Sequence, residues 1–169
     1  SSGNSGMGQM RKGSDNSNGT ADNSGIGVSD ILSAAKKLKG FIQTNRRLPD
    51  RVTVSNQSLT IAQFFELMLN VIVQINSDQA GLLTPKAVRE ALNPSGSATG
   101  QITKSEYIQM ANKILDFIKV YGRAPNYATT SIGRVSYPRL VYAITRILTF
   151  YNDNNRLPNY VTIKGVNRL

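Results

Sequence analysis

The chain has 169 residues, enough for one domain of ordinary size or two small halves, and it contains no Cys, His or Trp. Thiol nucleophiles, imidazole bases and the usual zinc sites therefore cannot be assembled, and the 10 Asp and Glu residues show no suggestive pair spacing. We expect no catalytic residue, no metal and no cofactor. The net charge of +10 favours an anionic partner such as nucleic acid, a membrane surface or an acidic wall polymer, unless it serves solubility alone.

Residues 1–25 form a tail rich in Ser, Gly and Asn, without an apolar period. This composition predicts a disordered segment. The tail also lacks the apolar stretch of a signal peptide. No run of 18 or more apolar residues occurs in the chain, so we expect no membrane-spanning segment.

The first half, residues 26–99, begins with a predicted helix over 30–45. Ile31, Leu38 and Ile42 keep helical spacing there, and the following Leu-Pro ends the helix, because proline forces the residue before it into extended conformations. A short extended piece is expected over 52–54.

Thr60 and Gln63 then predict a capping box, in which hydroxyl and amide satisfy the first backbone N–H groups of a helix. The helix they open is apolar on nearly every side, so we expect it at the centre of its half. Thr84-Pro85 predicts a short further helix that ends near Asn93, with Thr as the cap and Pro in the first turn.

The second half begins near residue 100 and follows the same plan. Thr103 and Glu106 predict another capping box, and the helix after it closes at Tyr121-Gly122. Ser136 is expected to cap the next helix. The sequence therefore predicts an all-α fold, made of tandem repeats of helix pairs joined by short extended loops or small hairpins.

One motif occurs three times, and it is the strongest signal in the sequence. It consists of an aromatic pair or Phe-Ile, four residues, Arg, Leu or Ala, and Pro. Its Pro residues are Pro49, Pro125 and Pro158, so the copies are separated by 76 and then 33 residues. Three copies in one register indicate internal repeats. Residues 26–99 and 100–169 are interpreted as two halves, the second of which also carries the opening of a further repeat.

Two interpretations of the repeated loop remain open. In the structural interpretation, Leu48 and Leu157 are buried in the core, Pro fixes the turn, and the aliphatic part of the Arg side chain packs over the end of the helix. In the binding interpretation, Tyr stacks on sugar rings, Arg forms bidentate hydrogen bonds with carboxylates, and Asn forms hydrogen bonds with amide groups. Arg51 stands where the other copies have Tyr, so the first copy should bind differently. The candidate binding residues are Arg47, Arg123, Asn126, Tyr127, Arg156, Asn159 and Tyr160.

The segment from Phe150 to Thr162, and more loosely 41–53 and 117–129, resembles the pseudomurein-binding repeat. The resemblance implies that both halves are pseudomurein-binding units, which anchor a larger protein to the wall polymer of methanogenic archaea. Such repeats occur in archaeal surface proteins and in viral endoisopeptidases, where a separate Cys-His-Asp domain cuts the wall. The resemblance allows such a domain to follow in the native protein, but this chain is not expected to be an enzyme.

The resemblance thus implies an extracellular, wall-associated module, or a virus-encoded one acting on the host wall. We expect pseudomurein as partner, no membrane, no nucleic acid, and a monomer. A basic helical nucleic-acid-binding protein is the alternative, although no helix carries a dense Arg and Lys stripe. An enzyme built on paired carboxylates is a third and weaker hypothesis.

Overall fold

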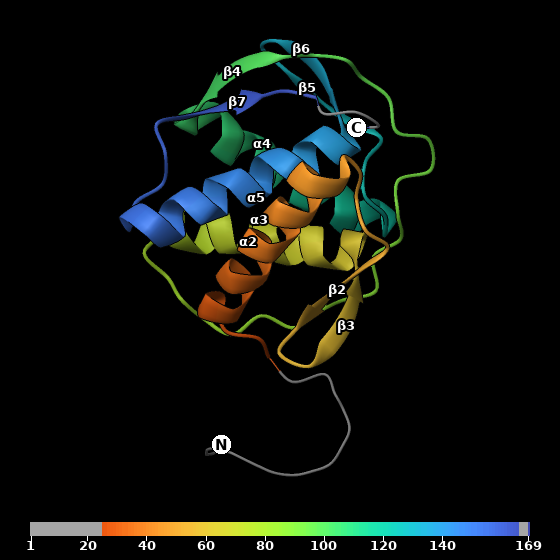
Figure 1. Cartoon of the computed structure of the whole chain (residues 1–169). Helices are drawn as coiled ribbons and strands as arrows, with labels where there is room; N and C mark the ends of the chain where they lie inside the picture. The colour runs from red at the N-terminus through yellow and green to blue at the C-terminus, as the bar shows by residue number, and fades with distance from the viewer. Residues whose placement is uncertain (1–24, 166–168) are drawn as a thin grey trace, which may run out of the picture.

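The computed structural model describes residues 25–165 and 169, and it shows a mixed α/β fold (Figure 1). Within these residues there are four helices and six four-residue strands. The all-α prediction was therefore wrong. The segments expected as loops or small hairpins pair as regular two-stranded sheets, because their β-branched residues suit extended backbone and their backbone groups find partners across the turn. The predicted tail lies almost wholly outside the described residues.

The helices lie close to their predicted bounds. They are α2 (Val28–Asn45), α3 (Ile61–Asn76), α4 (Lys104–Tyr121) and α5 (Tyr137–Asn154). The strands are β2 (Arg51–Val54), β3 (Gln57–Thr60), β4 (Gly100–Thr103), β5 (Tyr127–Thr130), β6 (Gly133–Ser136) and β7 (Tyr160–Ile163). Each helix of the described chain is thus followed or preceded by a strand.

The strands form three antiparallel pairs, β2 with β3, β5 with β6, and β4 with β7. The first two are hairpins between consecutive strands. The third joins segments almost sixty residues apart, with Ile102 opposite Val161. The β4–β7 pair therefore closes the second half of the chain into a ring of two strand–helix–strand units.

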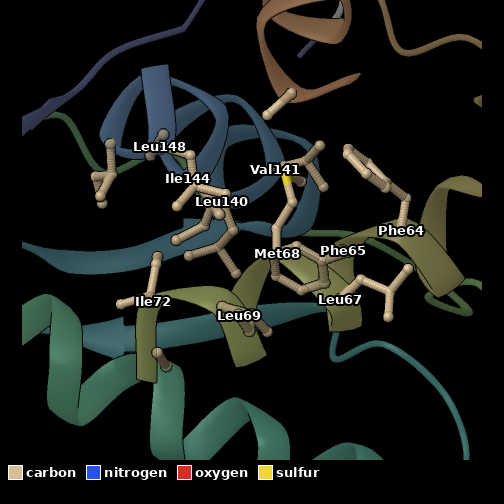
Figure 2. Packing of buried hydrophobic residues seen from close by; sticks show 14 of the residues in the cluster. Phe64, Phe65, Leu67, Met68, Leu69, Ile72, Leu140, Val141, Ile144 and Leu148 are labelled. Atoms are coloured by element: carbon tan, nitrogen blue, oxygen red, sulfur yellow. The ribbon is translucent and has the colours of Figure 1, made fainter. Parts of the chain in front are cut away.

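Helices α3 and α5 form the centre of the molecule and carry the most buried faces. Helix α2 packs across α5, and α4 packs against α3, so each outer helix covers the inner helix of the other half (Figure 1). Figure 2 shows the α3 side chains Phe65, Met68 and Ile72 meeting the α5 side chains Leu140 and Ile144. The two halves consequently share one hydrophobic core.

The predicted capping box at Thr60 is confirmed. The Gln63 backbone N–H donates to Thr60 Oγ1 at 3.2 Å, and the Thr60 N–H donates to Gln63 Oε1 at 3.0 Å. At Thr103 one arm forms, with the Glu106 N–H donating to Thr103 Oγ1 at 3.3 Å. Ser136 occupies the cap position of α5 but makes no side-chain cap bond.

The carboxylate of Glu106 turns instead to the β5–β6 hairpin, where it accepts the Ser131 N–H at 2.7 Å and the Ser131 hydroxyl at 2.6 Å. The first half repeats this link 76 residues earlier, with the Ser55 hydroxyl donating to Asp30 Oδ2 at 2.9 Å. In both halves an acid in the first helical turn therefore ties the helix to the hairpin that follows it.

The short helix expected from Thr84 to Asn93 is absent, and this prediction was wrong. The segment is extended at Arg89, whose N–H donates to the Gly122 carbonyl and whose carbonyl accepts from Ala124, both at 2.9 Å. Glu90 then accepts the Ala62 N–H at 2.8 Å and so caps α3. Tertiary hydrogen bonds replace the local ones that the Thr-Pro signal favoured.

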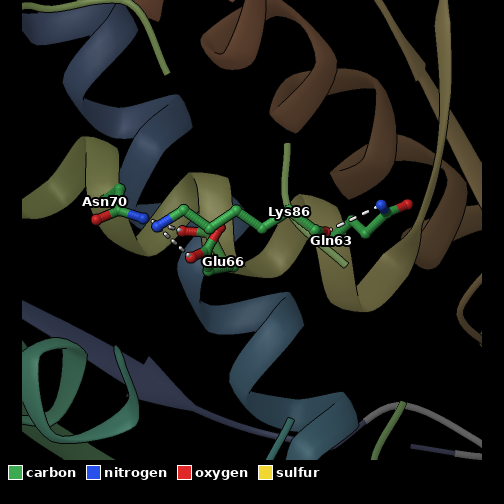
Figure 3. A network of polar contacts seen from close by, with 4 residues as sticks. All are labelled: Gln63, Glu66, Asn70 and Lys86. Atoms are coloured by element: carbon green, nitrogen blue, oxygen red, sulfur yellow. Dashed lines mark hydrogen bonds and ion pairs between the residues drawn. The ribbon is translucent and has the colours of Figure 1, made fainter. Parts of the chain in front are cut away.

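Glu66 of α3 is buried to 95%, and Lys86 from this extended segment reaches it at 3.9 Å (Figure 3). Its Oε1 atom has no hydrogen-bond partner. Desolvation raises the pKa of the Glu66 carboxyl above its usual value of 4.5, and the charge of Lys86 and a bond from Asn70 offset only part of that effect.

No helix of the described residues is both long and apolar enough to cross a lipid bilayer.

The raised pKa of Glu66 gives a testable pH dependence. The native state holds this proton more tightly than the unfolded chain does, so Glu66 stabilises the fold most below pH 4.5, and this contribution is lost as pH rises through the native pKa. The Glu66→Gln substitution removes that titration. We expect the stability of this variant, relative to that of the native sequence, to increase as pH rises from about 4 to about 8, so that its free energy of unfolding becomes larger by comparison.

Urea unfolding at several pH values measures this difference. Asp116→Asn is the matched control, because Asp116 is an exposed carboxylate on α4. The control shows how much of the stability difference comes from removing one exposed carboxylate. A Glu66→Gln difference that is flat with pH would contradict the assignment.

Candidate functional site

The three repeated Phe and Arg residues form stacked pairs. The guanidinium carbon of Arg47 lies 5.1 Å from the centre of the Phe41 ring. The corresponding distances are 5.6 Å for Arg123 on Phe117 and 4.9 Å for Arg156 on Phe150. These distances fit cation–π attraction. The pairing explains why the two residue types recur together at a fixed spacing.

A left-handed helix end brings each Arg back over its Phe. The capping residues Arg46, Gly122 and Asn155 have φ of 60°, 70° and 57°. Their N–H groups bond the carbonyls four residues earlier at 2.7–2.8 Å. The chain therefore reverses at the same point in all three copies, and the next residue, the repeated Arg, folds back along the last helical turn.

The Leu-Pro part of the motif serves the framework. Leu157 and its counterpart Ala124 are buried, and Leu48 is half-buried against the core. The hydroxyl of Tyr107, a fully buried side chain of α4, donates to the Pro158 carbonyl at 2.5 Å. Burial raises the pKa of this phenol above its usual value, so it stays a donor. Helix α4 thus fixes the turn that precedes β7.

Two grooves occupy equivalent places in the second half. The larger, of about 580 Å³, lies between α5 and β7, and the smaller, of about 230 Å³, lies between α4 and β5. We call them the α5–β7 groove and the α4–β5 groove. Seven lining residues correspond at the offset of 33. In the smaller and larger groove respectively they are Lys113 and Arg146, Ile114 and Ile147, Phe117 and Phe150, Pro125 and Pro158, Tyr127 and Tyr160, Ala128 and Val161, and Thr129 and Thr162.

The α5–β7 groove gathers three residues singled out from the sequence, Arg156, Asn159 and Tyr160. The Tyr160 side chain is 51% exposed, so its ring is accessible. The backbone carbonyl of Asn159 accepts the Lys104 N–H at 2.8 Å, which fixes this turn against the start of α4. A cation, an amide and a phenol ring thus lie along one wall.

The α4–β5 groove includes Tyr127 but not Arg123 or Asn126. One face of the Tyr127 ring is covered by Arg134, whose guanidinium carbon lies 4.4 Å from the ring centre. Asn126 accepts the Asn93 N–H at 2.7 Å through its side chain, and its carbonyl accepts the Ser95 N–H at 3.2 Å. The structure therefore uses Asn126 to hold the segment between the halves.

The first copy of the loop is arranged differently. Arg47 is exposed at the end of α2 and donates to the Leu48 carbonyl at 3.2 Å. Arg51, at the Tyr position, donates to the Ser58 hydroxyl at 2.7 Å and the Ser58 carbonyl at 2.8 Å. This side chain is bonded back onto the neighbouring strand, and the first copy presents no ring there.

Several lining residues were not among the candidates from the sequence, including Lys113, Arg146, Lys39 and Gln43. Lys113 and Arg146 sit one helical turn before the repeated Phe, and extending the offset of 33 back into the helices would have found them. Lys39 and Gln43 reach the α5–β7 groove from α2. No repeat pattern places these two there, because the contact depends on how α2 crosses α5.

Comparison with known families identifies the unit that carries both grooves. Residues 98–130 and 131–163 each match the family model of the pseudomurein-binding repeat. The boundary falls in the β5–β6 turn, so one repeat is β4–α4–β5 and the other is β6–α5–β7. No curated protein matches the chain. Residues 98–163 therefore match two consecutive pseudomurein-binding repeats, and strand pairing joins the two matched units at both ends.

Proposed function

We propose that this protein is a non-catalytic module that anchors a larger protein to the pseudomurein wall of methanogenic archaea. The observation that carries the proposal is the match of two consecutive pseudomurein-binding repeats. Its setting is outside the cell, on the wall, whether the larger protein is an archaeal surface protein or a viral lysis enzyme.

The paired grooves supply the binding sites. Each has most of its lining in one matched repeat and places a Tyr ring, a Phe ring and a cation beside an extended strand. Tyr rings offer apolar faces to sugar rings, and their hydroxyls remain available for hydrogen bonds. Wall polymers built of sugars and peptides present both kinds of surface. A shallow groove in each repeat suits a polymer that is bound at several points.

Arginine side chains in this arrangement are preorganised. Stacking on Phe150 fixes the plane of the Arg156 guanidinium while its N–H edge remains free. Because the guanidinium group is already oriented, the Arg side chain loses less conformational entropy when it forms two hydrogen bonds to a ligand carboxylate. Arg123 and Arg47 are held by the same stacking, and we propose them as further contacts outside the grooves.

Sedimentation with isolated walls tests the proposal. The protein should sediment with pseudomurein sacculi and remain in solution with bacterial murein. A gel shift with duplex DNA at the same ionic strength tests the nucleic-acid alternative, which rests on the net charge of +10. Sedimentation with both wall types or with neither, or a DNA affinity that matches the wall affinity, would overturn the assignment.

A second experiment separates binding residues from framework residues. Tyr160→Ala should change the free energy of unfolding by less than about 0.5 kcal/mol, because the ring is half exposed. It should weaken wall binding by about 1 kcal/mol, roughly fivefold. Tyr127→Ala should weaken binding less, because Arg134 already covers one face of its ring. Leu157→Ala should instead cost roughly 2 to 5 kcal/mol of stability by emptying a core site.

Tyr121→Ala is the matched control for Tyr160→Ala. Tyr121 is equally exposed, at 50%, but lines neither groove. Its ring lies 5.3 Å from the guanidinium carbon of Arg123, so its loss can affect wall binding only through Arg123 and should weaken it less than the loss of Tyr160 does. Equal binding losses in the two variants would show that exposed tyrosines act without regard to the groove, and full binding by a folded Tyr160→Ala protein would remove Tyr160 from the site.

A further inference from the structure

The α5–β7 groove is not built from the matched repeats alone. Two of its lining residues, Lys39 and Gln43, belong to α2, which lies outside residues 98–163. The Gln43 amide donates to the Tyr142 hydroxyl of α5 at 3.2 Å. The Tyr142 ring in turn lies 5.3 Å from the guanidinium carbon of Arg146. A chain of polar contacts thus connects the first half of the protein to the base of this groove.

The groove collects positive charge from three parts of the fold. Lys39 comes from α2, Arg146 from α5 and Arg156 from the turn before β7, and Asp153 is the one carboxylate among the described residues that line it. Within the described part of the chain, a single ion pair is formed, between Lys86 and Glu66. None of the three groove cations therefore forms an ion pair with a carboxylate of the described residues. Like charges held close together repel one another. An anion bound between these cations would relieve that repulsion, so the groove favours an anionic ligand.

The Arg side chains are oriented as well as charged. Arg146 donates through Nη1 to the Thr162 carbonyl of β7, and Arg156 stacks on Phe150. Arg146 also lies over the Tyr142 ring, and within the described residues neither arginine uses all of its N–H groups in hydrogen bonds. Guanidinium groups held in this way match the planar, bidentate geometry of a carboxylate.

The α4–β5 groove has fewer cations in its lining. Its one cation is Lys113, and none of its described lining residues comes from the first half of the chain. The two grooves therefore share the Phe, Pro and Tyr framework but differ in charge.

We propose that the α5–β7 groove binds a carboxylate-bearing segment of the wall polymer, and that Lys39 of α2 completes this site from outside the matched repeats. This inference rests on the proposed function, and it adds that the ligand group bound in the α5–β7 groove is a carboxylate.

Two variants of the full-length chain test the contribution of α2. Lys39→Gln removes a groove cation, and Lys36→Gln removes the same charge from an exposed position on the same helix outside the groove. Wall binding by Lys39→Gln should fall about fivefold, the upper range for one partly exposed charge contact, while Lys36→Gln should bind like the native sequence. Thermal unfolding of both variants checks that they are folded.

Chemically modified sacculi test the ligand. Carbodiimide coupling to ethanolamine converts wall carboxylates to uncharged amides, and acetylation blocks wall amines without touching carboxylates. The native protein should bind untreated and acetylated walls equally and should lose at least tenfold in affinity for amidated walls, because more than one cation loses its partner.

Each outcome has a separate meaning. Unchanged binding to amidated walls overturns the carboxylate assignment, and equal binding by Lys39→Gln and Lys36→Gln overturns the role of α2. Both failures leave the proposed function standing as long as untreated walls are bound. Absence of binding to untreated walls overturns the proposed function itself, and this inference with it. Because the amidation arm uses the native sequence, it gives a result even if Lys39→Gln does not fold.

Discussion

Helix α3 is apolar on nearly every side, and the rest of the structure depends on covering it. Ten of its sixteen residues are buried, among them Phe64, Phe65 and Met68. One partner helix cannot cover such a surface, so α5, α4, α2 and the extended segment near Lys86 all pack around it. Covering α3 draws the two halves of the chain into one core and leaves α2 lying across α5. The α5–β7 groove is a consequence of that crossing, because one of its walls belongs to each half.

Local sequence signals were sufficient for the helices. The apolar period, the capping box at Thr60 and the Leu-Pro stop at Pro49 act within a few residues of the elements that they define, and the four helices begin within two residues of their expected starts. The errors came where partners are distant in sequence. Two such features are the pairing of β4 with β7 and the hydrogen bonds of Arg89 to the loop at Gly122, and both depend on the assembled core. From local signals alone, the same residues were therefore predicted to form a loop and a short helix.

The candidate site shows the same limit. The repeated motif identified Arg156, Asn159 and Tyr160, which do line one groove together. It could not distinguish them from Asn126, whose amide is used by the backbone of Asn93, because both asparagines follow Pro in the same motif. Lys39 carried no signal at all beyond a basic helix face. A repeat in the sequence thus predicts which positions are equivalent, whereas packing against non-repeated neighbours decides which of them remain free to bind.

The three copies of the motif show how one framework can hold different surfaces. Stacking of Arg on Phe, the left-handed helix end and a Leu or Ala packed against the core are common to all three copies, and they set the shape of the loop. The residue two positions after Pro is not constrained in this way. It is Arg51 bonded to Ser58 in the first copy, Tyr127 covered by Arg134 in the second, and Tyr160 open to solvent in the third. Because the framework contacts do not involve this position, it can change without loss of the fold. Divergence there, together with the cation that α2 adds to the α5–β7 groove, gives the two grooves different surfaces on one repeated framework.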